Sequence, residues 1–198
     1  METTLNFLSE PCEEMSVPGN AIPDQQLIEG CAANCRKAQE QLYNRYRNPM
    51  LALCFRYTRH QEDAIEVLHE GLLKVFQNIK DFDSSRSAIY TWIHTIMVRT
   101  AIDFLRRKKL ETISIEWNDI NEPAIQPETI IDRSAEEILY FLKLLPEMSA
   151  TVFNLYVIEG YKHKEISQLL NISEGTSKWH LSEAKKQLTN CFAKRTIF

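Results

Sequence analysis

Near the C-terminus, residues 174–190 carry a pattern of lysine, tryptophan and hydroxyl side chains that could contact nucleic acid. At 100° per residue, one side of this predicted helix is small or apolar and carries Ser177, Leu181, Ala184 and Leu188. The opposite side presents Gly175, Lys178, Trp179, Ser182, Glu183 and Lys186. A large aromatic side chain exposed between two lysines is unusual for a core helix. In a DNA major groove, lysines reach phosphates or guanine, while tryptophan and serine contact base edges or sugars.

The residues that precede this helix favour the DNA interpretation. A short helix is predicted over Lys162–Leu170, followed by a tight turn at Asn171–Ile172, and Ser173 can cap the last helix. A short helix, a turn of three residues and a longer helix form the helix-turn-helix pattern. The alternative is an ordinary bundle of three or four helices in which Trp179 contacts a neighbouring domain.

A second candidate for nucleic-acid binding lies on a helix predicted from about Ala88 to Lys109. Trp92, Arg99 and Arg106 are spaced by seven residues along one edge, near Arg86 and Tyr90. Aromatic rings among cations suit single-stranded nucleic acid, because bases stack on the rings while the cations meet phosphates. We expect Tyr90 to be a core residue. For Trp92, the core and the nucleic-acid interpretation are equally open.

An acidic row on residues 62–77 is a third candidate surface. Apolar residues at helical spacing run from Ala64 to Ile79, and Glu62, Glu66 and Glu70 recur on the opposite side. Leu73 lies within this row, about 150° from the centre of the apolar stripe. A charge row alone is usually a solvated face, whereas an apolar residue within it indicates docking to a basic partner surface.

The sequence shows no arrangement typical of an enzyme or a metal site. The histidines are dispersed, and no Ser/His/Asp, Cys/His or paired-carboxylate pattern stands out. Five scattered cysteines suit a reducing compartment: Cys12, Cys31, Cys35, Cys54 and Cys191. Cys31 and Cys35 lie one helical turn apart, and we interpret them as buried small side chains rather than as a zinc site or a disulfide. We therefore predict no catalysis, cofactor or metal.

Helical patterns cover both halves of the chain, so the predicted fold class is all-α. In the first half, further helices are predicted over Leu27–Tyr46 and Met50–Thr58. In the second half, Ser134 and Glu137 form a capping box ahead of one helix, and Pro146 begins another that stops at Gly160. The scarcity of turn residues, with five glycines and seven prolines in 198 residues, argues against an all-β fold.

The charge distribution divides the chain into four parts although the net charge is only −4. Residues 1–29 and 110–132 each hold six acidic residues and no lysine or arginine, whereas residues 30–109 have a balance of +6 and residues 133–198 of +2. We predict a mobile tail (1–23), a first helical domain (24–109), an acidic linker (110–133) and a helix-turn-helix domain (134–198). The N-terminus lacks the pattern of a signal peptide and no apolar run is long enough to span a membrane, so we expect a cytoplasmic protein.

Three segments together resemble the extracytoplasmic-function sigma factors, which are small relatives of sigma-70 that keep the second and fourth sigma regions. These are DAIEVLHEGLLKVFQNIKDFD (63–83), YTWIHTIMVRTAIDFLRR (90–107) and EGYKHKEISQLLNISEGTSKWHLSEAKKQL (159–188). The resemblance implies an RNA polymerase subunit that recognises promoters, with region 2 and region 4 as its two helical domains. It assigns Glu66, Glu70 and Leu73 to the clamp helices of the polymerase β′ subunit. It assigns opening of the −10 element to the edge that carries Arg86, Trp92, Arg99 and Arg106.

For region 4, the resemblance implies binding of the −35 element and of the polymerase β flap. The residues expected at the −35 element are Glu174, Gly175, Thr176, Lys178, Trp179, Ser182 and Lys186. Arg99, Trp179 and Glu183 depart from the family pattern, so the promoter sequence does not carry over. The family also implies an anti-sigma factor, often membrane-anchored, as a partner. The alternatives are a helix-turn-helix regulator that acts without core polymerase and an all-helical interaction module with no DNA role.

Overall fold

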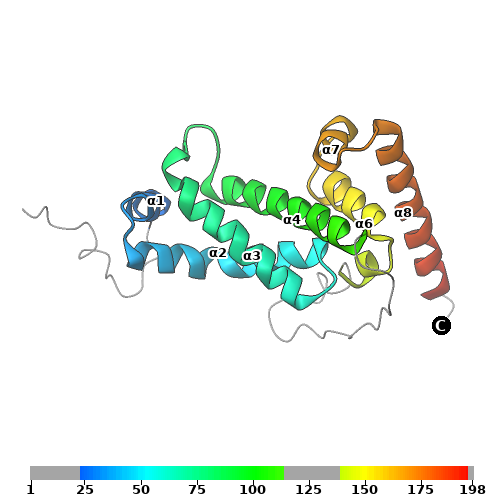
Figure 1. Ribbon diagram of the computed structural model, residues 1–198, viewed down its shortest axis with the longest axis horizontal. Coiled ribbons are helices and arrows are strands. Elements are labelled where there is room, and N and C mark those ends of the chain that lie inside the picture. The colour runs from blue at the N-terminus through cyan, green and yellow to red at the C-terminus, as the bar shows by residue number, and fades with distance from the viewer. Residues whose placement is uncertain (1–22, 114–138, 196–198) are drawn as a thin grey trace, which may run out of the picture.

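The computed structural model describes residues 23–113 and 139–195, and both described parts are helical without any strand. The first part contains α1 (Asp24–Ala32), α2 (Arg36–Tyr57), α3 (Gln61–Asn78), the single turn η1 (Ile79–Asp81) and α4 (Ile89–Ile113) (Figure 1). The second part contains α6 (Glu147–Phe153), the π-helical turn η2 (Asn154–Ile158), α7 (His163–Leu170) and α8 (Glu174–Arg195). The all-α prediction is confirmed.

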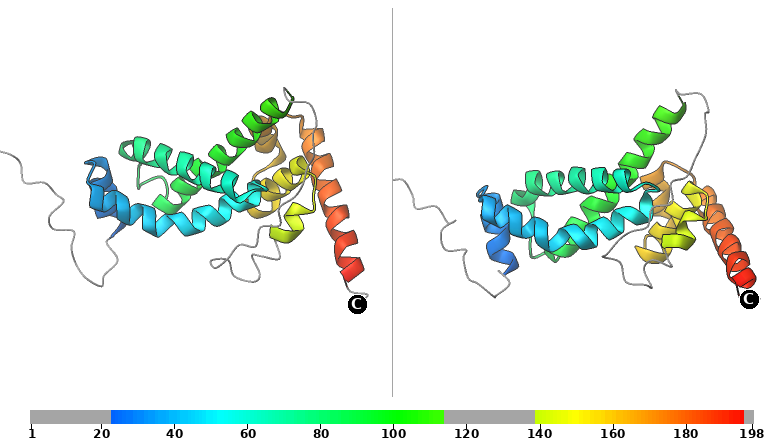
Figure 2. Two further views of the ribbon diagram at one scale, coloured as in Figure 1. Left: turned by 60° about the horizontal axis from the view of Figure 1, so that its bottom comes forward. Right: turned by 90° about the horizontal axis from the view of Figure 1, so that it is seen from below.

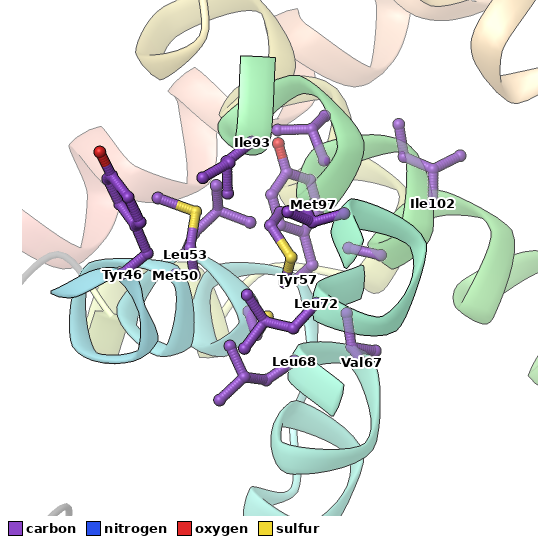
Figure 3. Close-up of a cluster of buried hydrophobic side chains, with 14 of the residues drawn as sticks. Tyr46, Met50, Leu53, Tyr57, Val67, Leu68, Leu72, Ile93, Met97 and Ile102 are labelled. Carbon is purple, nitrogen blue, oxygen red and sulfur yellow. The ribbon is translucent and has the colours of Figure 1, made fainter. Parts of the chain in front are cut away.

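Helices α2, α3 and α4 pack on one another and form the core of the first part (Figure 2). Figure 3 shows Met50 and Leu53 of α2, Leu68 and Leu72 of α3, and Ile93 and Met97 of α4 turned toward a common centre. All six side chains are almost completely buried. The stripe predicted on α3 is therefore the face that packs, because its residues recur every three or four positions.

Gly71 allows α3 and α4 to approach closely. A Cβ atom at this position would lie 2.2 Å from the Sδ atom of Met97, whose side chain is completely buried. Glycine within a helix costs up to about 1 kcal/mol relative to alanine. Here the tight helix packing explains why it is present.

The N-terminal helices differ from the prediction. The helix predicted over Leu27–Tyr46 is interrupted after Ala32, because Asn34 takes a left-handed conformation with φ of 59°, which asparagine tolerates better than most residues. The break predicted before Met50 is absent, since α2 continues through Pro49. Packing of its buried residues outweighs the lost backbone hydrogen bond.

The helix boundaries in the second part agree closely with the predicted ones. Helix α6 begins directly after Pro146, and Gly160 ends the helical segment with φ of 76°, a conformation that glycine adopts at no steric cost. At α8, the Ser173 hydroxyl accepts a hydrogen bond from the Thr176 backbone N–H at 3.0 Å, as expected of an N-cap. The capping box at Ser134 and Glu137 lies outside the described residues.

The linker prediction needs one correction. Helix α4 continues to Ile113, so residues 110–113 are helical and not part of an extended connector. The rest of the predicted linker and the predicted tail over residues 1–22 lie outside the described residues. No helix in the described parts is long and apolar enough to cross a membrane.

Candidate nucleic-acid interfaces

The outer face of α8 exposes the residues that the sequence predicted to face outward. Trp179 is 60% exposed and stands edge-on to the His180 ring at 4.8 Å between centroids. Glu174, Gly175, Thr176, Lys178, Ser182 and Lys186 are also exposed, and Glu183 is half-buried. The inner face holds Ser177, Leu181 and Ala184, all buried. The face is thus a strip with an aromatic side chain and two cations, which suits a DNA groove.

Two histidine–serine pairs position α8 on the rest of its domain. The Nδ1 atom of His180 lies 3.0 Å from the Ser149 hydroxyl of α6, and His163 Nδ1 of α7 lies 2.9 Å from the Ser177 hydroxyl. Both serines are completely or almost completely buried. The Tyr156 ring stacks on His163 at 4.5 Å. The sequence did not predict these pairs. Ser177 on the inward face of α8 was nevertheless a signal, because a buried hydroxyl needs a polar partner.

On α4, the predicted edge is a mixture of packed and exposed side chains. Trp92 is half-buried and packs on Phe82 with ring centroids 5.4 Å apart. Tyr90 is 47% exposed, so the prediction that it is a core residue is wrong. Tyr90 lies at the first turn of α4, where its ring is tilted against the rings of Tyr46 and His94, with centroids 6.4 and 5.8 Å away. The aromatic side chain offered to solvent is therefore Tyr90 more than Trp92.

The cations of this edge are accessible. Arg99 is exposed, and Arg106 is 57% exposed with its guanidinium 3.7 Å from Asp103. Arg86 lies on the loop before α4, where its side chain is 84% exposed and its Nε atom is 3.3 Å from Asp83. Such weak surface ion pairs leave the guanidinium groups available to phosphates.

The loop that carries Arg86 is organised by Asp83. Its carboxylate accepts hydrogen bonds from the backbone N–H and the hydroxyl of Ser85, at 2.9 and 2.6 Å. The hydroxyl bond, followed by the backbone bond, lowers the pKa of Asp83 below its usual value. This local turn fixes where the loop leaves η1 and enters α4.

Leu73 projects from α3 into solvent, as the sequence predicted. It is 57% exposed and borders an open hollow. The other residues that line the hollow come mainly from the same helix and are Glu62, Ile65, Glu66, His69, Glu70 and Arg107. An exposed leucine within a polar rim is typical of a protein-binding surface.

The acidic row on α3 is partly neutralised from within the molecule. Arg107 of α4 binds both carboxylate oxygens of Glu70, at 3.3 and 2.5 Å, and Lys74 Nζ lies 2.8 Å from the same group. The hydrogen bonds from Arg107 are the largest cause of a lowered pKa at Glu70. Lys108 likewise contacts Asp63. Glu62 and Glu66 remain exposed, so they carry most of the negative charge offered to a partner.

Cys31, Cys35 and Cys54 are buried, as interpreted from the sequence, whereas Cys191 is half-buried. Cys31 is a free thiol, so it does not pair with Cys35, which is disulfide-bonded. Burial raises the pKa of Cys31 to about 11 and that of Cys54 to about 12, which keeps both thiols protonated. Among the described residues, no group of three or more histidine, cysteine or carboxylate side chains is placed to hold a metal ion.

Comparison with known proteins identifies both helical parts. The family model "Sigma-70 region 2" matches residues 42–111, and "Sigma-70, region 4" matches residues 135–188, so together they cover more than half of the chain. The extracytoplasmic-function (ECF) RNA polymerase sigma-E factor of Haemophilus influenzae is 27% identical over 184 residues, covering 85% of this chain and 95% of the relative. The ECF sigma factor SigM of Bacillus subtilis is 24% identical and covers 75% of this chain and 91% of its own length.

A solved structure shares the fold. The sigma factor RpoE of Bartonella quintana, crystallised with the anti-sigma factor NepR, superposes with a TM-score of 0.54 at 17% identity, covering 78% of this chain and 96% of that one. The family matches and the relatives do not favour a regulator that acts without core polymerase. The chain belongs to the sigma-70 family and is an RNA polymerase sigma factor of the extracytoplasmic-function type, which directs core polymerase to promoters.

Proposed function

We propose that this sigma factor divides its work among three surfaces on its two domains. The observation that carries the proposal is the exposure of two large apolar side chains, Leu73 on the first domain and Trp179 on the second. Each is flanked by charged residues of opposite sign to its proposed partner. We assign residues 24–109 to core polymerase and the −10 element, and residues 134–198 to the −35 element.

The surface around Leu73 binds the clamp helices of the polymerase β′ subunit. Leu73 supplies the apolar contact, and Glu66 meets basic groups of the partner. Glu70 acts mainly by holding Arg107 beside the hollow, because its charge is already paired. A binding hot spot usually consists of a central apolar residue, which loses its water on binding, and of charged residues at the rim.

The exposed edge of α4 and the loop before it open the −10 element. Arg86, Arg99 and Arg106 meet phosphates, while an unstacked base of the displaced strand stacks on an aromatic ring. The half-buried Trp92 forms one wall of the base pocket against Phe82. Tyr90, with its exposed ring, joins the set as a second stacking surface.

The outer face of α8 binds the −35 element in the major groove. Lys178 and Lys186 contact phosphates or guanine, Trp179 and Ser182 contact base edges or sugars, and Glu174, Gly175 and Thr176 lie where the helix enters the groove. The same domain contacts the polymerase β flap. Neither domain needs high affinity alone, because polymerase holds both at a fixed separation.

The cellular setting follows from these partners. We place the protein in the cytoplasm, where polymerase and promoters are, and expect an anti-sigma factor to control it. A relative of the same fold has been crystallised with an anti-sigma factor, which supports this expectation. No catalytic role or cofactor belongs to the proposal.

In vitro transcription with bacterial core polymerase and a genomic promoter library tests the function. The purified chain is expected to direct initiation at a small set of promoters and to co-purify with core enzyme. A protein that binds one duplex tightly at physiological salt without core polymerase would contradict the proposal.

Variants on the two surfaces test the division of labour. Trp179→Ala and Lys178→Ala should each reduce −35-dependent initiation roughly tenfold, because one good base or phosphate contact contributes 1–3 kcal/mol. They should leave core binding unchanged, and Lys37→Ala on α2 serves as the control. Leu73→Glu should weaken core binding by roughly 30-fold, the size of a hot-spot residue. Equal effects of the α8 variants and of Leu73→Glu on core binding would overturn the assignment.

A further inference from the structure

Trp179 is held against its neighbour in the chain. Successive side chains of a helix point about 100° apart, so residues at positions i and i+1 do not normally face each other. The indole of Trp179 nevertheless stands edge-on to the imidazole of His180, with ring centroids 4.8 Å apart and ring planes at 69°. This is a favourable geometry for two aromatic rings. Among the described residues, His180 carries the only ring in contact with Trp179, so the indole leans along α8 toward His180.

The His180 ring is itself fixed from a second helix. Its Nδ1 atom lies 3.0 Å from the hydroxyl of Ser149 on α6, and the two groups share one hydrogen bond. Ser149 is only 1% exposed, and water cannot readily replace the imidazole as the partner of a buried hydroxyl. Helices α6 and α8 pack side by side (Figure 1). The buried serine thereby determines which way the imidazole faces on the surface of α8.

The other histidine–serine pair of this domain has no such link to the outer face of α8. His163 on α7 pairs with the buried hydroxyl of Ser177 at 2.9 Å. The ring that stacks on His163 is that of Tyr156 in η2. Both pairs join α8 to an earlier helix, but the Ser149 pair also leads on to a side chain that we propose to contact DNA. Ser177 is therefore a natural comparison for Ser149.

The orientation of Trp179 matters because most of this side chain stays available to DNA. It is 60% exposed although it contacts His180. An indole that is already oriented loses less conformational entropy on binding than one that rotates freely. It also presents a fixed outline, which fits some base pairs and excludes others. The orientation of the ring therefore affects which base pair is preferred, and not only how tightly DNA is held.

We propose that Ser149 is a positioning residue for −35 recognition. Through the His180 imidazole it fixes the orientation of Trp179, and so it sets the base preference at the position that this ring contacts. The proposal rests on the proposed function of the outer face of α8. Ser149 is too deeply buried to contact DNA itself. The cations of this face lie outside the link, so general affinity for DNA depends little on Ser149.

Initiation from templates randomised at the −35 element measures this preference, with the full chain and core polymerase. The base pair at which Trp179→Ala loses most discrimination is the position that Trp179 contacts. At that base pair, Ser149→Ala should lower the discrimination between the best and the worst base roughly threefold, the cost of ordering one free side chain. Preferences at the other base pairs should not change. Unchanged discrimination at the Trp179 position would overturn the proposal.

Ser177→Ala is the matched control, because it removes an equally buried hydroxyl that is also paired with a histidine. It should reduce the stability of the second domain about as much as Ser149→Ala does, but it should leave the base preference unchanged. Equal broadening of the preference by both serine variants would contradict the proposal, since any loosening of α8 would then have the same effect.

Two variants of His180 separate the ring from the hydrogen bond. His180→Asn keeps a hydrogen-bonding atom attached to Cγ, as Nδ1 is in histidine, but removes the ring. His180→Phe keeps a ring and loses the bond to Ser149. Both should broaden the preference at the Trp179 position, because both parts of the link are needed. A His180→Asn variant with an unchanged preference would show that His180 only tethers α8 to α6.

Fluorine NMR tests the orientation without DNA or polymerase. In the full chain labelled with 5-fluorotryptophan, the resonance of Trp179 is the one missing from Trp179→Phe. Ser149→Ala should shift and narrow this resonance, because the indole becomes more mobile, whereas Ser177→Ala should not. An unchanged resonance in Ser149→Ala would refute the positioning role. If the resonance responds but Trp179→Ala keeps every −35 preference, the proposed DNA contact of Trp179 is refuted instead, together with the specificity role that rests on it.

Discussion

The two domains position their binding surfaces by different means. In the first domain, α2, α3 and α4 share most of a large apolar core, in which Gly71 packs tightly against Met97. In the second domain, Ala184 of α8 packs in a small cluster with Leu142 and Leu145, and Leu181 reaches the edge of the large cluster. Hydrogen bonds between His163 and Ser177 and between His180 and Ser149 supplement these apolar contacts.

This difference indicates how each surface tolerates change. Close packing transmits any change of volume, because neighbouring side chains have no free space. Directional hydrogen bonds instead fix the orientation of a helix, and their loss costs about 1 kcal/mol each. The first domain should thus be sensitive to size, and the second to the loss of single polar atoms.

The largest expected effect is that of Gly71→Ala on the stability of the first domain. The new methyl group would overlap the buried Met97 side chain, and overpacking of this kind costs about 1–3 kcal/mol, partly offset by the helix propensity of alanine. Chemical unfolding followed by circular dichroism measures it. Gly175→Ala is the control, since its Cβ would meet only the Ser173 hydroxyl at 3.6 Å. Equal stability of both variants would contradict a packing role for Gly71.

A smaller loss is expected for Ser177→Ala, which tests the hydrogen-bonded half of the comparison. Removal of the hydroxyl leaves His163 without its partner and should destabilise the second domain by about 1 kcal/mol. The first domain should be unaffected, as exchange of its α3 amides can show. Ser182→Ala, exposed on the same helix, should have no effect. If Ser182→Ala destabilised the domain as much as Ser177→Ala, the pair of His163 and Ser177 would not be what positions α8.

A still smaller loss of stability is expected at the ion pair between Glu70 and Arg107 on the surface of the first domain. Glu70→Gln removes the pair with Arg107, and because Arg107 is 52% exposed the loss should stay below about 1 kcal/mol at pH 7. The hydrogen bonds from Arg107 lower the pKa of Glu70. The contribution of the pair to the free energy of unfolding is therefore present at neutral pH and disappears as the pH falls through that lowered pKa. Urea unfolding at pH 7 and pH 4 measures it, with Glu66→Gln as the control. A difference that grows toward low pH would have the wrong sign.

The smallest effect concerns the contact between the domains. Burial lowers the pKa of His94. The charge of Glu159 opposes this shift, and the charge of Arg56 adds to it. The Tyr90 ring also faces the His94 imidazole. The contact of Glu159 with His94 and Arg56 therefore favours neutral His94 and loses stability as the pH falls below about 6.5, the ordinary value for histidine. Exchange at residues 98–102, corrected for its intrinsic pH dependence, should rise about threefold from pH 7.5 to 5.5. His94→Gln should abolish this response; a variant that retains it would exclude His94.

Sequence reasoning was most successful where one residue type has one local consequence. Pro146, Gly160 and Ser173 mark element boundaries correctly, and the 3.6-residue period separates the inner and outer faces of α3 and α8. Exposure of Leu73 and Trp179 also followed from periodicity alone. These features depend on local geometry, which the sequence contains directly.

The errors concern contacts between distant segments. The Arg107–Glu70 pair, the histidine–serine pairs and the Arg56–Glu159 pair join residues between 14 and 103 positions apart, and no spacing rule connects them. The exposed position of Tyr90 and the continuous helix through Pro49 likewise depend on what packs nearby. Which ions meet, and which rings stay accessible, is decided by tertiary packing and not by local propensity.

The end of α4 at Ile113 sets a limit on how far the domains can separate. Between Ile113 and Leu139 the chain can span no more than on the order of 90 Å, the contour length of its covalent backbone. The centres of DNA elements 25 base pairs apart lie about 85 Å from each other along the duplex. Because each domain also spans part of that distance, the connection is long enough for both elements to be bound by one chain.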